Sequence, residues 1–160
     1  MNTPNTPDIP NTPDTPDTPN APTRFDWDTK IAVVLREDLA VWQKLNVTAF
    51  ATSGIAATVE GVTGDPYVDG DGVKYLPMFR QPVLIFSTTA ERMKTIHQRA
   101  LQREVLVAVY PEAIFATNND EDNRATIADV PSAELLLAGI AVRGDKKDVD
   151  RVVRGATMHG

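Results

Sequence analysis

The chain has 160 residues, no cysteine and a formal net charge of −6 at pH 7. The lack of cysteine excludes disulfides, thiolate nucleophiles and thiolate zinc sites. Its basic residues are scattered among acidic ones, which argues against a broad nucleic-acid surface. The first residues form no basic and apolar leader, and no apolar run approaches the roughly 20 residues that span a bilayer. We therefore expect a soluble, cytoplasmic protein that binds neither membranes nor nucleic acid.

The first 24 residues differ in composition from the rest of the chain. Prolines recur at every third position from Pro4 to Pro22, seven of the twelve in the sequence. This period matches polyproline II, and the segment has almost nothing apolar to bury. We interpret residues 1–24 as a disordered, solubilising tail; a docking strip for a proline-reading module is the alternative. Residues 25–160 then have the size of a single domain.

Apolar segments alternate with amphipathic ones along that domain. Short runs rich in β-branched residues predict buried strands, and three- to four-residue spacing of apolar side chains predicts helices. The predicted strands are 30–36, 82–87, 105–110 and 135–142. The predicted helices are 41–59, 88–100, 118–130 and 145–158, besides a helical turn at 112–117. The side chains expected to face inward are Trp42, Leu45, Ala49, Ala56 and Val59 in the first, Met93, Ile96 and Ala100 in the second, and Val149, Val152 and Val153 in the last. Thr88 and Glu91 have the spacing of a capping box at the start of the second helix.

A turn-rich insertion at 61–77 interrupts this alternation. Two short apolar pairs flank Gly70-Asp71-Gly72, which predicts a β-hairpin. Asp69 and Asp71 would also suit a calcium loop, but Val73 stands where the next ligand is needed. His97 and His159 share no ligand spacing with a carboxylate, so we expect neither a metal nor another cofactor. The element order predicts an α/β fold: a three-layer sandwich with a mixed, mainly parallel, four-stranded sheet and helices on both faces.

Four separated blocks of sequence are similar to one uncharacterised family. They are Lys30–Leu39, Tyr75–Val83, Ala108–Glu121, and Ala141–Gly144 with Val149–Ala156. Together they resemble the family named domain of unknown function 2000 over the whole chain after the tail. More remotely, a strand ending in Arg-x-Asp-Leu, a lysine early in the first helix, a Gln-Pro strand entry and a glycine before the last helix resemble type II peptidyl-tRNA hydrolases. That resemblance implies a mixed four-stranded sheet between helices, often in a homodimer.

The hydrolase resemblance does not extend to the residues of the first helix. Lys44 is followed by Leu45, Asn46, Val47 and Thr48 rather than by the glutamine and histidine of the hydrolases. Glu112 is only a loose counterpart of their acidic residue after the third strand. We therefore expect no peptidyl-tRNA hydrolysis.

Polar side chains gather where the first and third predicted strands end. In open α/β sheets, ligands bind beyond the carboxyl ends of the strands, so these side chains share one edge if the two strands are parallel. The candidate ligand-binding residues are Arg36, Asp38, Lys44, Asn46, Thr48, Tyr110, Thr117 and Asn118. Arginine and lysine beside a helix N-terminus suit a carboxylate or phosphate. The alternative is that Arg36 and Asp38 form a surface ion pair and the amides and hydroxyls only cap helices.

Two functions remain open at this edge. The first is a binding module for a small anionic ligand or another protein. The second is a divergent hydrolase in which Lys44, with Asp38 or Glu112, polarises a carbonyl and positions water. We favour binding, because the sequence contains no complete set of acid, base and nucleophile.

Overall fold

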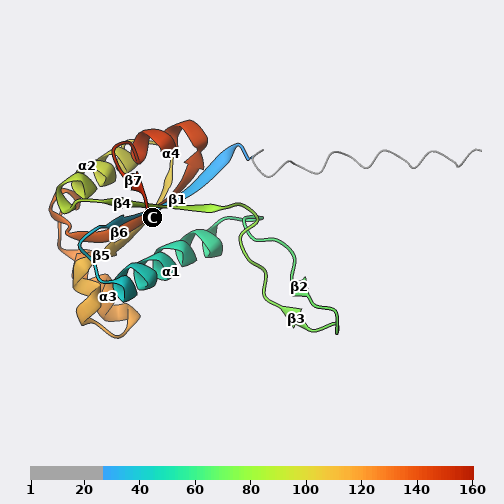
Figure 1. Cartoon of the computed structure of the whole chain (residues 1–160). Coiled ribbons are helices and arrows are strands. Elements are labelled where there is room, and N and C mark those ends of the chain that lie inside the picture. Colours follow the sequence, from blue (N-terminus) through green and yellow to red (C-terminus); the bar gives the residue numbers. More distant parts are fainter. Residues whose placement is uncertain (1–26) are drawn as a thin grey trace, which may run out of the picture.

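The computed structural model describes residues 27–160, so the prediction for the proline-rich tail lies outside the described residues. Five strands form one sheet in the order β5-β6-β1-β4-β7, and a separate hairpin pairs β2 with β3 (Figure 1). The strands are β1 Thr29–Arg36, β2 Tyr67–Val68, β3 Lys74–Tyr75, β4 Val83–Thr88, β5 Leu106–Pro111, β6 Leu137–Asp145 and β7 Thr157–Met158. The helices are α1 Val41–Thr58, α2 Ala90–Leu101, η1 Glu112–Ala116, α3 Asp120–Ala128, η2 Ser132–Glu134 and α4 Lys146–Val152.

The predicted mixed α/β fold is confirmed, but the mainly parallel sheet is wrong. Only β1 and β4 pair in parallel; β6 is antiparallel to both β1 and β5, and β7 is antiparallel to β4. The difference arises in the connection between β5 and β6. We expected a helix that crosses the sheet, but α3 has no buried residue and so does not pack on it. The chain therefore turns back beside β5, because only a packed crossover would return it in the parallel direction.

The sheet contains a fifth strand, β7, which the sequence analysis assigned to the closing helix. Helix α4 ends at Val152, and Gly155 follows with a φ of 91°, a conformation that glycine adopts freely. The chain then pairs with β4 at Phe86 and Ser87. The three valines predicted to face inward from α4 are buried: Val149, Val152 and Val153.

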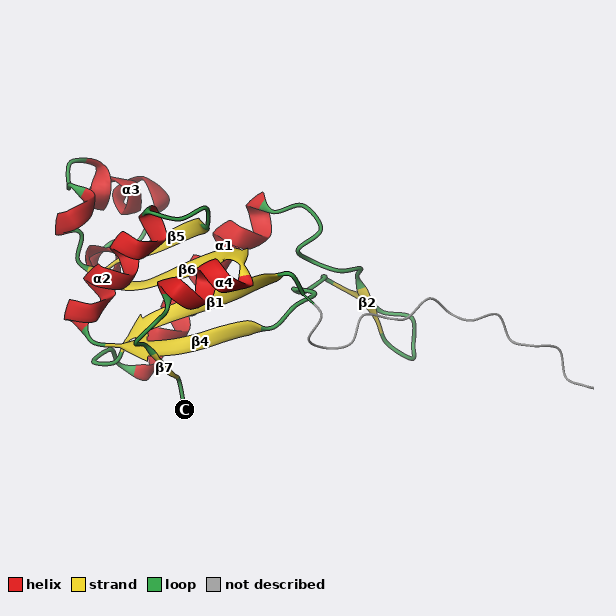
Figure 2. Ribbon diagram, turned by 90° about the horizontal axis from the view of Figure 1, so that it is seen from above, coloured by secondary structure: helices red, strands yellow, loops and turns green. Residues whose placement is uncertain are grey.

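Alternate residues of β1 serve two hydrophobic clusters, one on each face of the sheet. Helix α1 covers one face, and α2 and α4 cover the other (Figures 1 and 2). Ile31, Val33 and Leu35 pack against α1. Ala32 and Val34 pack against α2 and α4 on the other face. All five are nearly inaccessible, as expected of a central strand covered on both sides.

Helix α1 has the predicted bounds but turns a different face to the sheet. Its buried residues are Val47, Ala51 and Ile55, whereas Trp42 and Leu45 are 62% and 67% exposed. The predicted inward face was wrong because apolar residues occur on several sides of this helix, so their spacing alone does not define one stripe.

Helix α2 has the predicted inward stripe of Met93, Ile96 and Ala100, but it begins one residue later than expected. Thr89, not Thr88, is the N-cap, and its side chain accepts a hydrogen bond from the Arg92 amide. Thr88 instead ends β4 opposite Arg36. The sheet pairing therefore takes precedence over the capping-box spacing.

Candidate functional site

The first and third predicted strands, β1 and β5, run in the same direction, because both are antiparallel to the strand between them. Their carboxyl ends therefore lie at one edge of the sheet, as the site prediction required. Two arrangements of polar side chains occupy this edge: an ion-pair cluster centred on Arg36 and a pocket walled by aromatic rings.

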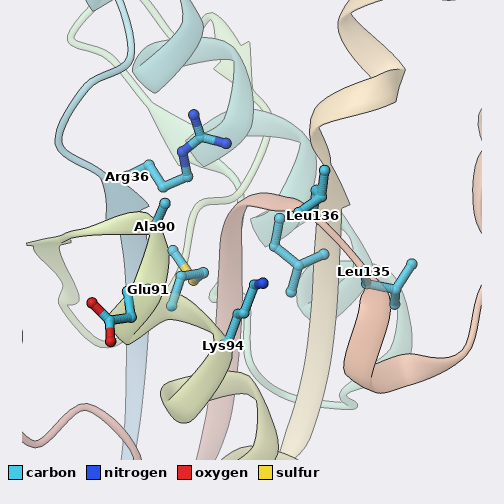
Figure 3. Close-up of a pocket in the computed structure, with 8 residues that line it drawn as sticks. Arg36, Ala90, Glu91, Lys94, Leu135 and Leu136 are labelled. Atoms are coloured by element: carbon cyan, nitrogen blue, oxygen red, sulfur yellow. The ribbon is translucent and has the colours of Figure 1, made fainter.

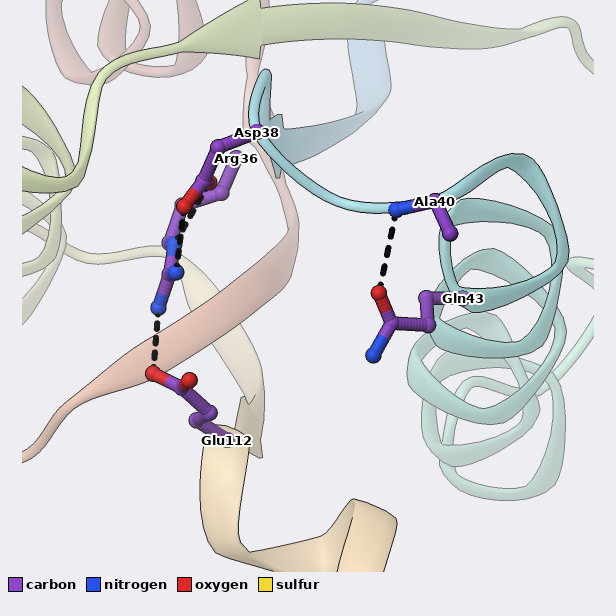
Figure 4. Close-up of polar contacts among 5 residues, drawn as sticks. All are labelled: Arg36, Asp38, Ala40, Gln43 and Glu112. Atoms are coloured by element: carbon purple, nitrogen blue, oxygen red, sulfur yellow. Dashed lines mark hydrogen bonds and ion pairs between the residues drawn. The ribbon is translucent and has the colours of Figure 1, made fainter.

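Arg36 bridges two carboxylates from different segments (Figure 4). Its Nε and Nη2 donate to the two oxygens of Asp38 at 2.9 and 2.7 Å, and its Nη1 donates to Glu112 Oε2 at 2.5 Å. The Arg36 side chain is 13% exposed, whereas both carboxylates are about half exposed. The hydrogen bonds that Arg36 donates to Asp38 are the main reason that the pKa of Arg36 is raised, and the same bonds lower the pKa of Asp38. These charge-assisted hydrogen bonds link the end of β1 to η1.

This cluster leaves little positive charge for a ligand. The guanidinium already faces two carboxylates, so the three side chains together carry one negative charge. Arg36 also lines an apolar hollow of about 280 Å³ on the α2 side, together with Lys94 and Leu136 (Figure 3). Its guanidinium nitrogens are nonetheless the ones bound to Asp38 and Glu112.

A larger cavity of about 570 Å³ lies between α1, the end of β5, η1 and the start of α3. We call it the aromatic–amide pocket. It is lined by Trp42, Asn46, Phe50, Ser53, Tyr110, Ile114, Phe115, Thr117, Asn118, Asn119, Asp120 and Asn123. Four of the eight predicted ligand-binding residues are among them: Asn46, Tyr110, Thr117 and Asn118.

The aromatic rings of the pocket contact one another in a continuous series. Trp42 meets Phe115 edge-on with centroids 5.7 Å apart, Phe115 meets Tyr110 at 5.0 Å, and Tyr110 meets Phe50 edge-on at 6.0 Å. Edge-to-face contacts of this kind hold rings at fixed angles. The four rings therefore constrain one another's orientation, although Trp42 and Phe50 each expose more than half of their surface.

Tyr110 carries the polar contact at the base of this wall. Its hydroxyl donates to Asn46 Oδ1 at 2.9 Å, and burial raises the pKa of the phenol. Tyr110 therefore stays a neutral donor at physiological pH. The bond leaves the Asn46 amide group, which makes no other hydrogen bond among the described residues, with two N–H donors for a ligand.

The asparagines at the other side of the pocket hold the loop before α3. Asn119 caps α3 by accepting from the Asp122 amide at 2.9 Å, and its own amide donates to Asn118 Oδ1 at 3.1 Å. The Thr117 hydroxyl contacts Asn123 Oδ1 and the Ile114 carbonyl. The residue that caps α3 is thus Asn119, which the sequence analysis did not name, and this loop presents several amide and hydroxyl groups to one cavity.

Lys44 and Thr48 lie on a different side of α1 from this pocket. Both line a separate cavity of about 330 Å³ between α1 and β4, and the Thr48 hydroxyl donates to the Lys44 carbonyl at 2.8 Å. Among residues 27–160, no carboxylate lies within ion-pair distance of the Lys44 ammonium, although its charge helps to lower the pKa of Asp38. The predicted ligand-binding residues therefore divide into three places at one edge.

The sequence analysis missed the aromatic wall and the last two asparagines. It placed Trp42 on the inward face of the first helix, whereas this side chain is largely exposed and lines the pocket. A usable signal was present: Trp42, Asn46, Phe50 and Ser53 are spaced by four, four and three residues. Such residues share one face of a helix. The contribution of Phe115 and Asn123 follows only from the fold of the chain after β5.

Two further findings bound the chemistry of the described part of the chain. Within residues 27–160, no three His, Asp or Glu side chains gather closely enough to hold a metal ion. In the same range, every helix is too short or too polar to cross a bilayer.

Comparison with known proteins places this mixed α/β fold in a family. The family described as protein of unknown function DUF2000 matches residues 29–160, and the chain belongs to it. A solved structure of a protein of unknown function from Agrobacterium tumefaciens strain C58 is similar, with 46% sequence identity and a TM-score of 0.81. That similarity covers 84% of this chain and 99% of the other. No protein with a curated function matches the chain.

Proposed function

We propose that the protein is a small-molecule binding module whose ligand occupies the aromatic–amide pocket. The observation that carries this proposal is the junction of the aromatic series with the Tyr110–Asn46 hydrogen bond. Small-molecule sites combine apolar and aromatic walls with a few fixed polar groups. Tyr110 supplies both here, since its ring belongs to the wall and its hydroxyl orients the Asn46 amide.

The lining favours a neutral ligand over the anion expected from the sequence. Among residues 27–160, Asp120 is the one charged residue that lines the pocket, and it pairs with Arg124. Aromatic faces stack on planar rings, and amides both donate and accept. A planar heterocycle that bears amide or hydroxyl groups satisfies both features.

The geometry gives less support to the alternative of a divergent hydrolase. Asp38 and Glu112 are both bound to Arg36, and Lys44 lines the other cavity. A lysine–carboxylate site would require Asp38 or Glu112 to leave Arg36. We keep the likeness to type II peptidyl-tRNA hydrolases as a hypothesis about the scaffold alone, and cytoplasmic location as a prediction.

A thermal-shift screen tests the proposal and separates it from the anion site. The screen compares neutral heterocycles, sugars and small anions on the wild type and on Asn46→Leu, Arg36→Ala and Lys44→Ala. A neutral planar compound should raise the melting temperature of the wild type and of the two cation variants, but not of Asn46→Leu. An anion whose effect is lost in Arg36→Ala and Lys44→Ala but kept in Asn46→Leu would overturn the proposal in favour of the site expected from the sequence.

A further inference from the structure

The segment 61–82 forms a projecting ribbon, which we call the hairpin arm. At its base, Thr63 bridges Phe79 and the Gly64 amide donates to the Met78 carbonyl at 3.0 Å. Farther out, β2 pairs with β3. Val62 and Phe79 anchor the base in the core beneath α1, and beyond them the arm extends away from the body of the domain (Figures 1 and 2).

Hydrogen bonds hold the turn of the arm, but the side chains of the arm beyond its base have little to pack against. Asp69 accepts hydrogen bonds from the amides of Asp71 and Val73 and from the Tyr75 hydroxyl. Its apolar side chains are half or more exposed: Tyr67, Val68, Val73, Tyr75, Leu76 and Met78. An isolated two-stranded ribbon is marginally stable in water at best. A run of exposed apolar side chains on such a ribbon marks an interaction surface.

A complementary surface lies on the same chain, between α1 and β4. Helix α1 packs towards β1, β6 and β5. The C-terminal segment pairs with β4 at Phe86 and Ser87 through β7, and at Ile85 through the His159 amide. This leaves a cavity of about 330 Å³, the α1–β4 groove. It is lined by Leu35, Val41, Lys44, Leu45, Thr48, Ile85 and His159.

The groove and the arm match in polarity and in charge. Val41 and Leu45 beside the groove are 73% and 67% exposed, and Leu76 on the arm is 86% exposed. Between its base residues Thr63 and Phe79, the arm carries Asp65, Asp69 and Asp71 against Lys74 alone, so this part is net acidic; Arg80 lies beyond it, at the base. The groove has no acidic residue in its lining, and Lys44 there has no carboxylate within ion-pair distance in the described part of the chain.

We infer that the hairpin arm of one copy of this chain occupies the α1–β4 groove of a second copy, and the reverse, in a twofold dimer. The arm points away from its own domain, so it is free to reach a neighbour (Figure 1). It also lies on the α1 side of the sheet, the side on which the groove opens. In such a reciprocal contact each copy uses the same two surfaces, as in other isologous interfaces, so the assembly stops at a dimer. It covers the exposed apolar side chains of both surfaces at once and gives Lys44 an acidic partner.

Charge reversal on the full chain tests the pairing. Sedimentation equilibrium should show a dimer for the wild type. Lys44→Glu and Asp71→Lys should each weaken the dimer at least tenfold, and the double variant should recover most of the affinity. Asp71 is suitable because only its backbone amide serves the turn.

Two further variants separate this surface from others. Leu76→Ser should also weaken the dimer, since Leu76 is almost fully exposed and its loss leaves the core intact. Leu106→Ser is the matched control, because Leu106 is an exposed apolar residue, 45% accessible, at the opposite edge of the sheet. Circular dichroism verifies that each variant is folded. A wild type that stays monomeric at millimolar concentration, a dimer sensitive to Leu106→Ser but not to Leu76→Ser, or a double charge reversal without recovery would each overturn the inference.

Discussion

Gly139, the third residue of β6, determines how closely α1 approaches the sheet, and substituting it tests the packing that positions the pocket. A Cβ at this residue would lie 2.6 Å from Val47 Cγ1, 2.9 Å from the Val34 carbonyl oxygen and 3.2 Å from Leu35 Cδ2. Favourable contacts begin at about 3.5 Å. Val47 cannot rotate away freely, because a valine in a helix has one strongly preferred rotamer. The Val34 oxygen belongs to the central strand and cannot move without disturbing the sheet.

Gly139→Ala should therefore lower the free energy of unfolding by about 1–3 kcal/mol, the usual cost of overpacking a filled core. In a domain of this size each kcal/mol corresponds to roughly 3–5 °C in melting temperature. A shift of Val47 away from the new Cβ should also move Asn46, which is its neighbour on α1 and lines the pocket. We expect a weaker Tyr110–Asn46 contact, seen as altered near-ultraviolet circular dichroism of tyrosine.

Gly54→Ala is the matched control for this substitution. Gly54 lies within α1, and a Cβ there would meet only the Ala108 Cβ at 3.7 Å, an ordinary contact. Because alanine favours a helix over glycine by roughly 1 kcal/mol, this variant should be as stable as the wild type or more so. Urea unfolding of the three proteins measures both effects. If Gly139→Ala proved as stable as Gly54→Ala, the close approach of α1 to β6 would be refuted.

Two further predictions concern ionisable groups. Burial lowers the pKa of His97, so below about pH 6.5 the unfolded chain binds a proton that the folded chain does not, and the free energy of unfolding should fall with decreasing pH. His97→Gln should flatten this part of the stability profile measured by urea unfolding between pH 7.5 and 5.5; parallel profiles for the two proteins would contradict it. Arg36→Met should return the pKa of Asp38 towards its ordinary value, because the hydrogen bonds from Arg36 are the main cause of its lowering. Carboxyl NMR titration measures this, and an unchanged Asp38 would show that the ion-pair cluster does not form in solution.

The sequence was sufficient to predict the elements that bury a continuous apolar stripe. Met93, Ile96 and Ala100 were assigned correctly because the rest of α2 is polar apart from its terminal residues Ala90 and Leu101, so only one face can be buried. The same reasoning failed for α1, where Trp42 and Leu45 are apolar but face outward. Local periodicity thus identifies a helix more reliably than it identifies the face that meets the sheet.

The direction of β6 could not be predicted from local pattern, because it depends on a segment that does not pack. The spacing between β5 and β6 allows a crossover helix, and nothing in the sequence of α3 forbids its formation. What α3 lacks is a buried face. The site was predictable in part for a related reason: β1 and β5 are parallel whether they are neighbours or have β6 between them, so Arg36 and Glu112 meet in either topology.

The insertion of β6 also explains why the edge holds two arrangements instead of one. With an antiparallel strand between β1 and β5, the carboxyl ends of these two strands are separated by the start of β6, where Leu137 pairs with Pro111. Arg36 spans that separation to reach Glu112, which fixes η1 against β1. Phe115 of η1 then lies over α1 and completes the aromatic series with Trp42 and Tyr110. On this reasoning the ion-pair cluster positions the wall of the pocket, and the groups that we propose to bind the ligand are the neutral side chains beyond it.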